Sequence, residues 1–362
     1  MKRSFDDVFE DKTKYGTKIK TDEYHNAGSH IIVDQGQEQI AGYTDIEEGL
    51  FIDVPAIIFG DHTRVIKYVE APFFLGADGV KVLRSRYSDA NYKYLYYALK
   101  NARIPNTGYN RHFKWLKETM IPYPDSSEQT KIVEVLDKVS MLIAYRRQEF
   151  QKLDELIKAR FVEMFGDLHT NSKGWKIKNF SEMTDLITDG EHATPKRKSE
   201  GIYLLSARNV INHSLQLDDV DYIDKDEYDR IAKRVIPQAG DVLISCSGTV
   251  GRCCTVPNGL KFQMVRSVAL LRFKTEIIPT FAEYMITSDY LQEQINSTKT
   301  ASSQANLFQG KIARLKGFVP PTELQQEFNM FVQQVDKSKV AIQRSLDKTQ
   351  LLFDSLMQKY FG

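Results

Sequence analysis

A short loop in the second half of the chain carries side chains suited to contact with nucleic acid. The stretch EHATPKRK, from Glu191 to Lys198, places a histidine and three basic residues around Pro195. A DNA-binding protein needs cations for the phosphates and planar polar groups for the base edges. Downstream, Arg208 and Asn209 follow the apolar IYLL, and they suit guanine and adenine because each forms bidentate hydrogen bonds. The alternative for the first stretch is a solvated charged loop.

Further polar candidates lie in a glycine-rich turn and in the first half of the chain. The turn from Ser245 to Arg252 permits close backbone approach to a phosphate. The stretches DQGQEQIAGYT and GDHTR hold the corresponding side chains of the first half. The candidate DNA-contacting residues are therefore Gln35, Gln37, Tyr43, His62, Arg64, His192, Lys196, Arg197, Lys198, Arg208, Asn209, Ser247 and Arg252. For any one of them, a surface polar residue without a ligand is the commoner outcome.

No motif of a known catalytic class accompanies these residues. The proline pair of FVPPT, residues 318–322, lacks both flanking residues of the tetrad that amino-methyltransferases use. Gly310 and Lys311 are followed by Ile312, where a nucleotide-binding loop requires Ser or Thr. PDSSEQTK, residues 124–131, has Glu-x-x-Lys spacing instead of the Glu-x-Lys of nucleases. We therefore predict a protein that is not an enzyme and has no catalytic residues.

The composition restricts where this protein acts and what kind of binding site it has. A formal net charge of +1 means that any nucleic-acid surface must be a local basic patch. No apolar stretch approaches the ~20 residues of a membrane span, and the N-terminus lacks the apolar core of a secretory signal. We therefore predict a cytoplasmic protein with no membrane contact. Cys246, Cys253 and Cys254 fit no zinc spacing and are expected to be small buried residues, so we predict no metal site.

Two similar stretches supply the elements that must hold these loops. KARFVEMFG, at 158–166, is echoed by LMQKYFG at the end of the chain. A shift of 196 residues places Pro124 on Pro320, and the match continues without a gap to the shared Phe-Gly ends. Ser126 and Thr322 each stand three residues before a glutamine, which predicts a capping box at the start of a helix.

Both stretches have the apolar periodicity of a coiled coil. Residues spaced alternately by four and three are mostly apolar or aromatic in each copy. The run from Glu128 to Phe165 would be ~57 Å long as a helix, and two such helices in one chain most simply pack on each other. Two unrelated amphipathic helices are the alternative. The predicted seam and partner-docking residues are Ile132, Leu136, Val139, Ile143, Phe150, Leu153, Ile157, Phe328, Val332, Val335, Ile342, Leu346, Phe353 and Leu356.

A fainter repeat precedes each helical stretch. At an offset of 188 residues, Asp53 falls on Asp241 and Val80 on Val268. Both copies show a β-rich run, a glycine turn and a second β-rich run. Extra residues between 288 and 303 would account for the larger offset further on. The chain is therefore predicted to contain two distantly related globular parts, each followed by a closely related helix.

Taken together, these stretches resemble the specificity subunits of type I restriction-modification systems over essentially the whole chain. The similarity rests on MIPYPDSSEQTKIVEVLDKV with LDELIKARFVEMFGD, and on GFVPPTELQQEFNMFVQQVDKSKV with FDSLMQKYFG. It also rests on GDVLISCSGTVGR, RSVALLRF and LITDGEHATPKRKSEGIYLLSARNV. The resemblance implies an α+β fold of two mixed α/β-rich target-recognition domains in an internal pseudo-two-fold repeat, separated by two long antiparallel coiled-coil helices.

The resemblance also implies an organisation and a role. The first target-recognition domain would span 1–109, the central helical region 110–167, the second domain 168–305 and the C-terminal helical region 306–362. The domains would read an asymmetric bipartite site in double-stranded DNA. The helices would dock two modification (methyltransferase) subunits, with restriction (nuclease) subunits as further partners. The chain would bind no cofactor, because S-adenosylmethionine, Mg and ATP are expected on the partner subunits.

One departure from the family pattern stands at the N-terminus. The second globular part opens with SKGWKIKNFSEM, whereas the first opens with MKRSFDDVFEDK and has no tryptophan-containing lead-in. The first domain is therefore expected to be shorter or to take an edge from elsewhere in the fold. The alternative function is a non-catalytic coiled-coil scaffold whose β-rich modules bind proteins. Such a scaffold would lack DNA binding that weakens steeply with salt.

Overall fold

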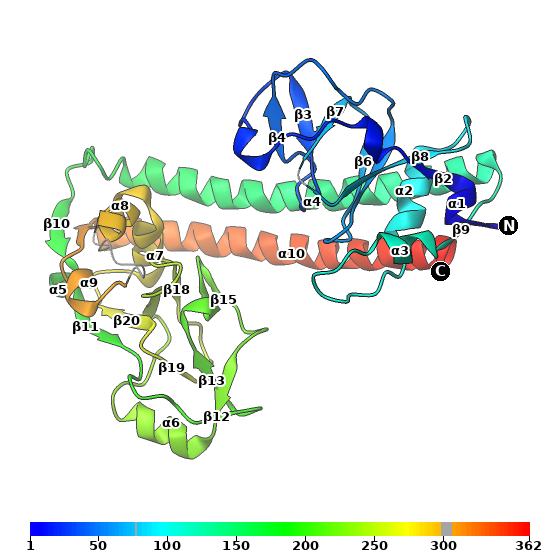
Figure 1. The fold of residues 1–362 in the computed structure, drawn as a ribbon. Helices are drawn as coiled ribbons and strands as arrows, with labels where there is room; N and C mark the ends of the chain where they lie inside the picture. The colour runs from blue at the N-terminus through cyan, green and yellow to red at the C-terminus, as the bar shows by residue number, and fades with distance from the viewer. Residues whose placement is uncertain (77, 298–305) are drawn as a thin grey trace. The chain divides into compact units, whose positions relative to one another are not determined.

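The computed structural model describes residues 1–76, 78–297 and 306–362. The chain divides into two compact units. Unit 1 consists of Met1–Gln148 and Gln343–Gly362, and unit 2 consists of Glu149–Ile342. Each unit therefore combines one globular α+β domain with one end of each of two long helices (Figure 1).

The two long helices are α4 (Ser126–Phe165) and α10 (Thr322–Phe361), each of 40 residues. Their first residues and their last residues both lie 196 positions apart, so the helical repeat is confirmed. Figure 1 shows them side by side, α4 in green and α10 in orange to red. At 1.5 Å per residue each helix is about 60 Å long.

Ion pairs within unit 2 give the relative direction of the two helices. Asp154 pairs with Lys339 at 2.5 Å, and Arg160 pairs with Glu327 at 2.8 Å. Residue numbers rise along α4 while those of the partners fall along α10. The helices are therefore antiparallel, as predicted.

The predicted seam residues lie in the contact between the helices and the domains rather than on the outer helix faces. The buried members are Ile132, Leu136, Val139, Ile143, Ile157, Phe328, Val332, Val335 and Phe353. The partly buried members are Phe150, Leu153, Ile342, Leu346 and Leu356. In unit 1, Leu136 and Ile143 share a core with Phe353, and in unit 2 Ile157 shares one with Phe328. Burial of these stripes is what stabilises such long helices.

The predicted capping boxes at the helix starts are wrong by one residue. The carboxylate of Asp125 accepts the backbone N–H of Glu128 at 2.9 Å, so Ser126 is the first helical residue and not the cap. Pro321, which has no side-chain acceptor, precedes Thr322 in the second copy. Ser-x-x-Gln spacing does not distinguish a cap from a first helical residue, because both place a short polar side chain near the free N–H groups.

The glutamines of the two helix starts make a different, repeated contact. The side-chain amide of Gln129 donates to the carbonyl of Pro124, and that of Gln325 donates to Pro320, each at 2.9 Å. Both side chains are buried, with 4% and 0% exposed. We call this repeated contact the glutamine–proline clasp.

The first globular domain contains two sheets. An antiparallel sheet has the order β2 (Phe9–Asp11), β8 (Val80–Ser85), β5 (Ala56–Gly60) and β6 (Ile66–Val69). A second sheet has the order β4 (Gly42–Thr44), β3 (His30–Val33) and β7 (Phe73–Leu75), with β3 and β7 parallel. The remaining elements are β1 (Lys2–Ser4), β9 (Met120–Pro122), α1 (Phe5–Val8), α2 (Tyr92–Lys100), α3 (Phe113–Lys117) and the 3₁₀ turns η1 (Thr13–Tyr15) and η2 (Thr21–Glu23).

The second globular domain repeats this plan. Its antiparallel sheet has the order β11 (Thr184–Asp189), β20 (Val268–Phe273), β17 (Val242–Ser245) and β18 (Cys253–Thr255). Its second sheet has the order β12 (Arg197–Lys198), β16 (Asp221–Ile223), β13 (Ile202–Leu205) and β19 (Phe262–Met264), with β13 and β19 parallel. The remaining elements are β10 (Lys176–Asn179), β14 (Val210–Ile211), β15 (Ser214–Leu215), β21 (Lys316–Val319), α5 (Phe180–Met183), α6 (Lys225–Ala232), α7 (Pro279–Thr287), α8 (Asp289–Ser297), α9 (Gln309–Ile312) and η3 (Ala207–Asn209).

The matching strand orders confirm the fainter repeat. Strand β8 begins at Val80 and β20 at Val268, which is the predicted offset of 188 residues. The extra residues expected between 288 and 303 include α8, whereas residues 298–303 lie outside the described residues. The domains therefore share a scaffold despite their weak sequence similarity.

An ion pair is repeated with the strands. Arg84 pairs with Asp53 at 2.5 Å, and Arg272 pairs with Asp241 at 2.7 Å. Asp53 is 54% exposed at its side chain, whereas Asp241 is 3% exposed. The carboxylate of this pair is therefore exposed in one domain and buried in the other, whereas both arginines are partly buried.

The N-terminal residues form the edge that the sequence comparison left open. Strand β1 pairs with β9 as β10 pairs with β21, both antiparallel. Each first strand leads into a one-turn helix with a capping box, at Ser4 in the first domain and at Asn179 in the second. The first domain therefore supplies this edge itself, even though it has no counterpart of Trp175 in its sequence.

Candidate nucleic-acid interface

The last two residues of the basic loop of the second domain, Arg197 and Lys198, form strand β12, and both are paired with carboxylates. Strand β12 lies beside β16, which brings Asp221 to the loop. Arg197 donates to Asp221 at 2.9 Å, Arg208 lies 3.1 Å from the same carboxylate, and Lys198 lies 3.3 Å from Asp224. Burial alone would raise the pKa of Asp221, but the bond from Arg197 and the charge of Arg208 outweigh it and lower the pKa. A phosphate would have to compete with these carboxylates.

Asn209 is buried, and its amide is saturated. Its oxygen accepts the backbone N–H and the hydroxyl of Ser206, at 2.9 and 3.1 Å. Its nitrogen donates to the carbonyls of Gln216 and Asp219, at 3.0 and 2.9 Å. With 1% of the residue exposed and all four hydrogen-bonding positions in use, Asn209 orders the turn and has no capacity left for an adenine.

Other candidates of the second domain divide into exposed and structural residues. His192 is exposed, with its Nε2 2.9 Å from Asp189, and Lys196 is also exposed. Arg252 instead donates to the carbonyl of Ala207 at 3.0 Å and holds the glycine turn in place. His192 and Ser247 line one cavity of ≈ 570 Å³, so the structure brings these two candidates together.

In the first domain, two candidates hold loops together. The side chain of Gln35 donates to the carbonyl of Asp78 at 2.9 Å and accepts the backbone N–H of His62 at 3.2 Å. The His62 ring stacks on Tyr109, with 4.7 Å between centroids and 9° between planes. Gln35 therefore positions His62 rather than facing a ligand.

The remaining first-domain candidates lie in two places. Gln37 is exposed and lines a hollow of ≈ 330 Å³ together with Arg64. Arg64 has a positive φ of 63° and donates to the carbonyl of Ile104 at 3.4 Å. Tyr43 lies partly buried on β4, opposite Ile31. Gln37 is thus the candidate of this domain with the most accessible side chain.

Sequence reasoning missed three exposed side chains in these regions. Tyr109, whose ring stacks on His62, is 89% exposed. Phe308, which lines the cavity of the second domain, is 63% exposed. Arg266 is also exposed and lines that cavity. An exposed aromatic residue in a polar stretch, such as NTGYN around Tyr109, was the signal available in the sequence.

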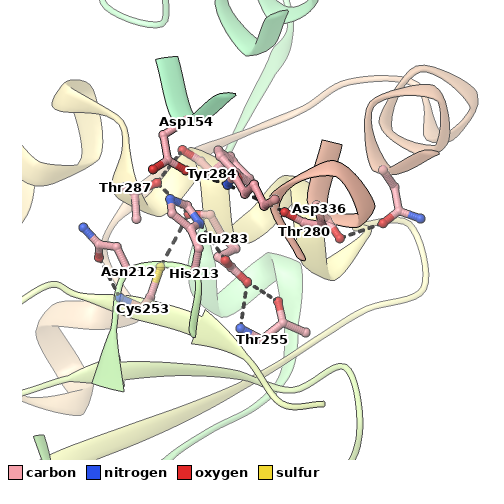
Figure 2. Close-up of polar contacts among 12 residues, drawn as sticks. Asp154, Asn212, His213, Cys253, Thr255, Thr280, Glu283, Tyr284, Thr287 and Asp336 are labelled. Atoms are coloured by element: carbon pink, nitrogen blue, oxygen red, sulfur yellow. Dashed lines mark hydrogen bonds and ion pairs between the residues drawn. The ribbon is translucent and has the colours of Figure 1, made fainter. Parts of the chain in front are cut away.

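A second cavity of unit 2, of ≈ 620 Å³, lies between the second domain and its ends of α4 and α10. His213 is one of the residues that line it, and Figure 2 shows His213 beside Glu283 and Tyr284. The imidazole Nδ1 lies 2.6 Å from Oε1 of Glu283, and the ring stacks on Tyr284 with 4.1 Å between centroids. Glu283 also accepts the backbone N–H of Thr255 at 2.7 Å (Figure 2). The buried carboxylate therefore joins the β14–β15 turn, β18 and α7.

Charged residues of the long helices complete this cavity. Lys339 lies between Asp154 at 2.5 Å and Asp336 at 3.6 Å. Burial raises the pKa of Asp336. His213 and Lys339 are thus both paired with carboxylates of this cavity, which is the arrangement of a contact between domain and helix.

Two further observations bear on chemistry. Among residues 1–76, 78–297 and 306–362, no group of three or more His, Cys, Asp or Glu side chains is placed to hold a metal ion. None of the helices in that part of the chain is long and apolar enough to cross a membrane.

Comparison with known proteins agrees with this architecture. A solved structure of the type I restriction-modification S subunit from M. genitalium covers 100% of this chain and 96% of its own, with a TM-score of 0.58 and 17% identity. A structure from work on complex assembly and conformational transition of the type I R-M system covers 99% of this chain and 95% of its own, with a TM-score of 0.52 and 17% identity. At this identity, the likeness shows the fold.

Sequence comparison gives the family. The specificity subunit of the type I restriction enzyme EcoR124I/EcoR124II from Escherichia coli is 31% identical over 151 residues, a match that spans 38% of this chain and 36% of that relative. The family model of the type I restriction modification DNA specificity domain matches residues 1–155 and 172–350, which are most of the chain in two halves. The chain therefore belongs to the type I restriction modification DNA specificity domain family.

Proposed function

We propose that this chain directs a type I restriction-modification complex to an asymmetric bipartite site in double-stranded DNA. Residues 1–109 and 168–305 act as the two target-recognition domains, and residues 110–167 and 306–362 act as the helical regions that connect them. The observation that carries the proposal is the doubled unit. Two domains with the same order of strands in their antiparallel four-stranded sheets precede two helices of equal length, while their polar loops differ.

The difference between the loops supports an asymmetric target. The basic stretch that forms β12 in the second domain has no counterpart strand in the three-stranded sheet of the first. Gln37 and Tyr109 of the first domain, and His192 and Lys196 of the second, are the exposed candidates for DNA contact. Base readout depends on the side chains that reach the groove, so two domains with different loops are expected to read different half-sites.

The helices support docking of two modification subunits. Leu156 on α4 and Leu352 on α10 occupy equivalent positions of the repeat and are 47% and 51% exposed. Large apolar side chains at equivalent solvent-facing positions suit two copies of one partner. Restriction subunits would join through that assembly. S-adenosylmethionine, Mg and ATP would bind the partner subunits, and the complex would work in the cytoplasm, where its DNA substrate is.

The test is the pattern of modified bases in host DNA. The chain is co-expressed with its modification subunit in a host whose own DNA methylation has been deleted, and modified bases are mapped by sequencing. The expected result is one motif with two different half-sites separated by unread positions. A second strain, in which the second domain is replaced by that of another family member, should keep one half-site and change the other. An assembled complex that modifies no motif, or one with two identical half-sites, would contradict the proposal.

A further inference from the structure

Most arginines of the second domain are already committed to protein contacts. Arg197 and Arg208 pair with Asp221, and Arg272 pairs with Asp241. Arg230 pairs with Glu191 and Glu227, and Arg234 pairs with Asp189. Arg252 donates to a backbone carbonyl. A paired guanidinium must give up its carboxylate before it binds a phosphate, so these residues are poor first contacts for DNA.

Arg266 differs from them. It stands two residues before β20, it is exposed, and no hydrogen bond or ion pair of its guanidinium exists among the residues that the structure describes. Its backbone N–H donates to the carbonyl of Glu191 at 3.0 Å, which fixes its position on the rim. An arginine without a competing carboxylate suits phosphate contact, because its guanidinium can donate two parallel hydrogen bonds to phosphate oxygens without first giving up a partner.

The charge of the cavity beside Arg266 is compatible with a bound DNA backbone. Asp189 supplies the carboxylate of the described lining. This carboxylate contacts His192 at 2.9 Å, accepts a hydrogen bond from Gln309 at 2.5 Å and pairs with Arg234. Burial raises the pKa of the Cys246 thiol to about 12, so this wall is neutral at physiological pH. No unpaired anion in the described lining opposes a phosphate.

Two further features of the same rim suit a nucleotide. Phe308 presents an aromatic side chain that is 63% exposed, and bases and sugars pack well on such surfaces. Gly248 has a φ of +69°, and nothing lies within 4 Å of where a Cβ would stand, so the turn leaves room for close approach. The cavity volume of ≈ 570 Å³ falls in the usual range for ligand sites.

The equivalent position of the first domain carries the opposite charge. Two residues before β8, where Arg266 stands before β20, the chain has Asp78, which pairs with Lys18 at 2.5 Å. The two domains share the strand that follows but not the charge that precedes it. This contact is therefore a property of the second domain and not of the shared scaffold.

From these observations we propose that the rim formed by Arg266, Phe308 and the Ser247–Gly248 turn is a DNA-backbone subsite of the second recognition domain, in which Arg266 binds a phosphate and Phe308 packs on the adjoining nucleotide. This proposal deepens the proposed function and rests on it. The main phosphate contact is then made by Arg266 and not by Arg197, Lys198 or Arg208, whose charges are balanced by carboxylates.

The test measures affinity of the full chain for a random-sequence 40-base-pair duplex by fluorescence anisotropy over a series of KCl concentrations. Arg266→Ala should weaken binding about tenfold at low salt and lower the slope of log K against log salt by about one. Arg266→Lys should keep most of the slope, because the charge remains. Phe308→Ala should weaken binding without changing the slope.

Arg314→Ala is the matched control, because Arg314 is exposed in unit 2 and does not line the cavity. It should bind as the wild-type chain does. Wild-type-like binding by Arg266→Ala, or equal losses from Arg266→Ala and Arg314→Ala, would overturn the subsite while leaving the proposed function intact. Absence of salt-dependent binding by the wild-type chain would overturn both. Circular dichroism of each variant ensures that a loss of affinity is not a loss of fold.

Discussion

Nδ1 of His213 lies 2.6 Å from Oε1 of Glu283, although the backbone of His213 is in the left-handed region, with a φ of 67°. That conformation costs a residue with a Cβ about 1–2 kcal/mol. The bond to the buried carboxylate and the stack on Tyr284 offset this cost. The β14–β15 turn is thus held to α7 by contacts that neither segment makes alone.

Glu283→Ala should destabilise unit 2. The change leaves the Thr255 N–H and hydroxyl and the His213 ring without their acceptor, which costs about 2–4 kcal/mol. Urea unfolding followed by fluorescence measures this loss. Trp115 belongs to unit 1 and Trp175 to unit 2, so Trp115→Phe isolates the signal of unit 2.

The control for this measurement is Glu323→Ala, at an exposed position of α10 in the same unit. Its unfolding midpoint should match that of the parent chain. If Glu283→Ala and Glu323→Ala shift the Trp175 transition equally, the buried carboxylate does not stabilise the domain.

The repeated arginine–aspartate pair should contribute unequally to the free energy of unfolding of the two domains. Asp241→Ala breaks a pair whose carboxylate is buried and should cost about 3 kcal/mol or more. Asp53→Ala breaks the equivalent pair, whose carboxylate is exposed, and should cost less than about 1 kcal/mol. The transitions of Trp175 and Trp115 report the two losses separately. Equal losses would show that exposure does not govern this contact.

Substitutions at the equivalent leucines should each remove one docking position. Leu156→Asp and Leu352→Asp change solvent-facing residues, so the helices should remain folded. Native mass spectrometry of the co-expressed complex should give one modification subunit per chain for either variant and two for the parent. Gln151→Asp, at an exposed polar position of α4, is the control and should retain two. Loss of both copies from a single variant would contradict independent docking positions.

The cysteines should be inert in the folded chain. Burial raises the pKa of Cys246 to about 12, and it also raises the pKa values of Cys253 and Cys254. Because the thiolate is the reactive form, the native protein should incorporate no iodoacetamide at pH 8, and it should gain little reactivity at pH 9. The same protein in urea should incorporate three. Rapid labelling of the native chain would mean that the β17–β18 region opens readily.

The sequence predicted what depends on local periodicity and repetition. The apolar spacing from Ile132 onward determines a helix, and the common offset gives the second helix from the first. Contacts between distant segments were not accessible in this way. Asp221 reaches Arg197 only because β16 pairs with β12, and Asn209 is saturated by carbonyls of the turn that it orders. Their residue types predicted contacts with DNA bases, whereas in the structure several of these side chains stabilise loops through contacts within the protein.

The glutamine–proline clasp has a consequence for how such a chain can change. Gln129 and Gln325 tie each helix start to the proline before it in the same way, whichever domain precedes it. In unit 2, Gln325 also donates to the carbonyl of Glu276 and accepts the backbone N–H of Ile278, so its contacts with the domain are to backbone groups. Side chains of the domains could therefore change without altering how the chain enters either helix, so new DNA targets could arise while the surface offered to partner subunits stays constant.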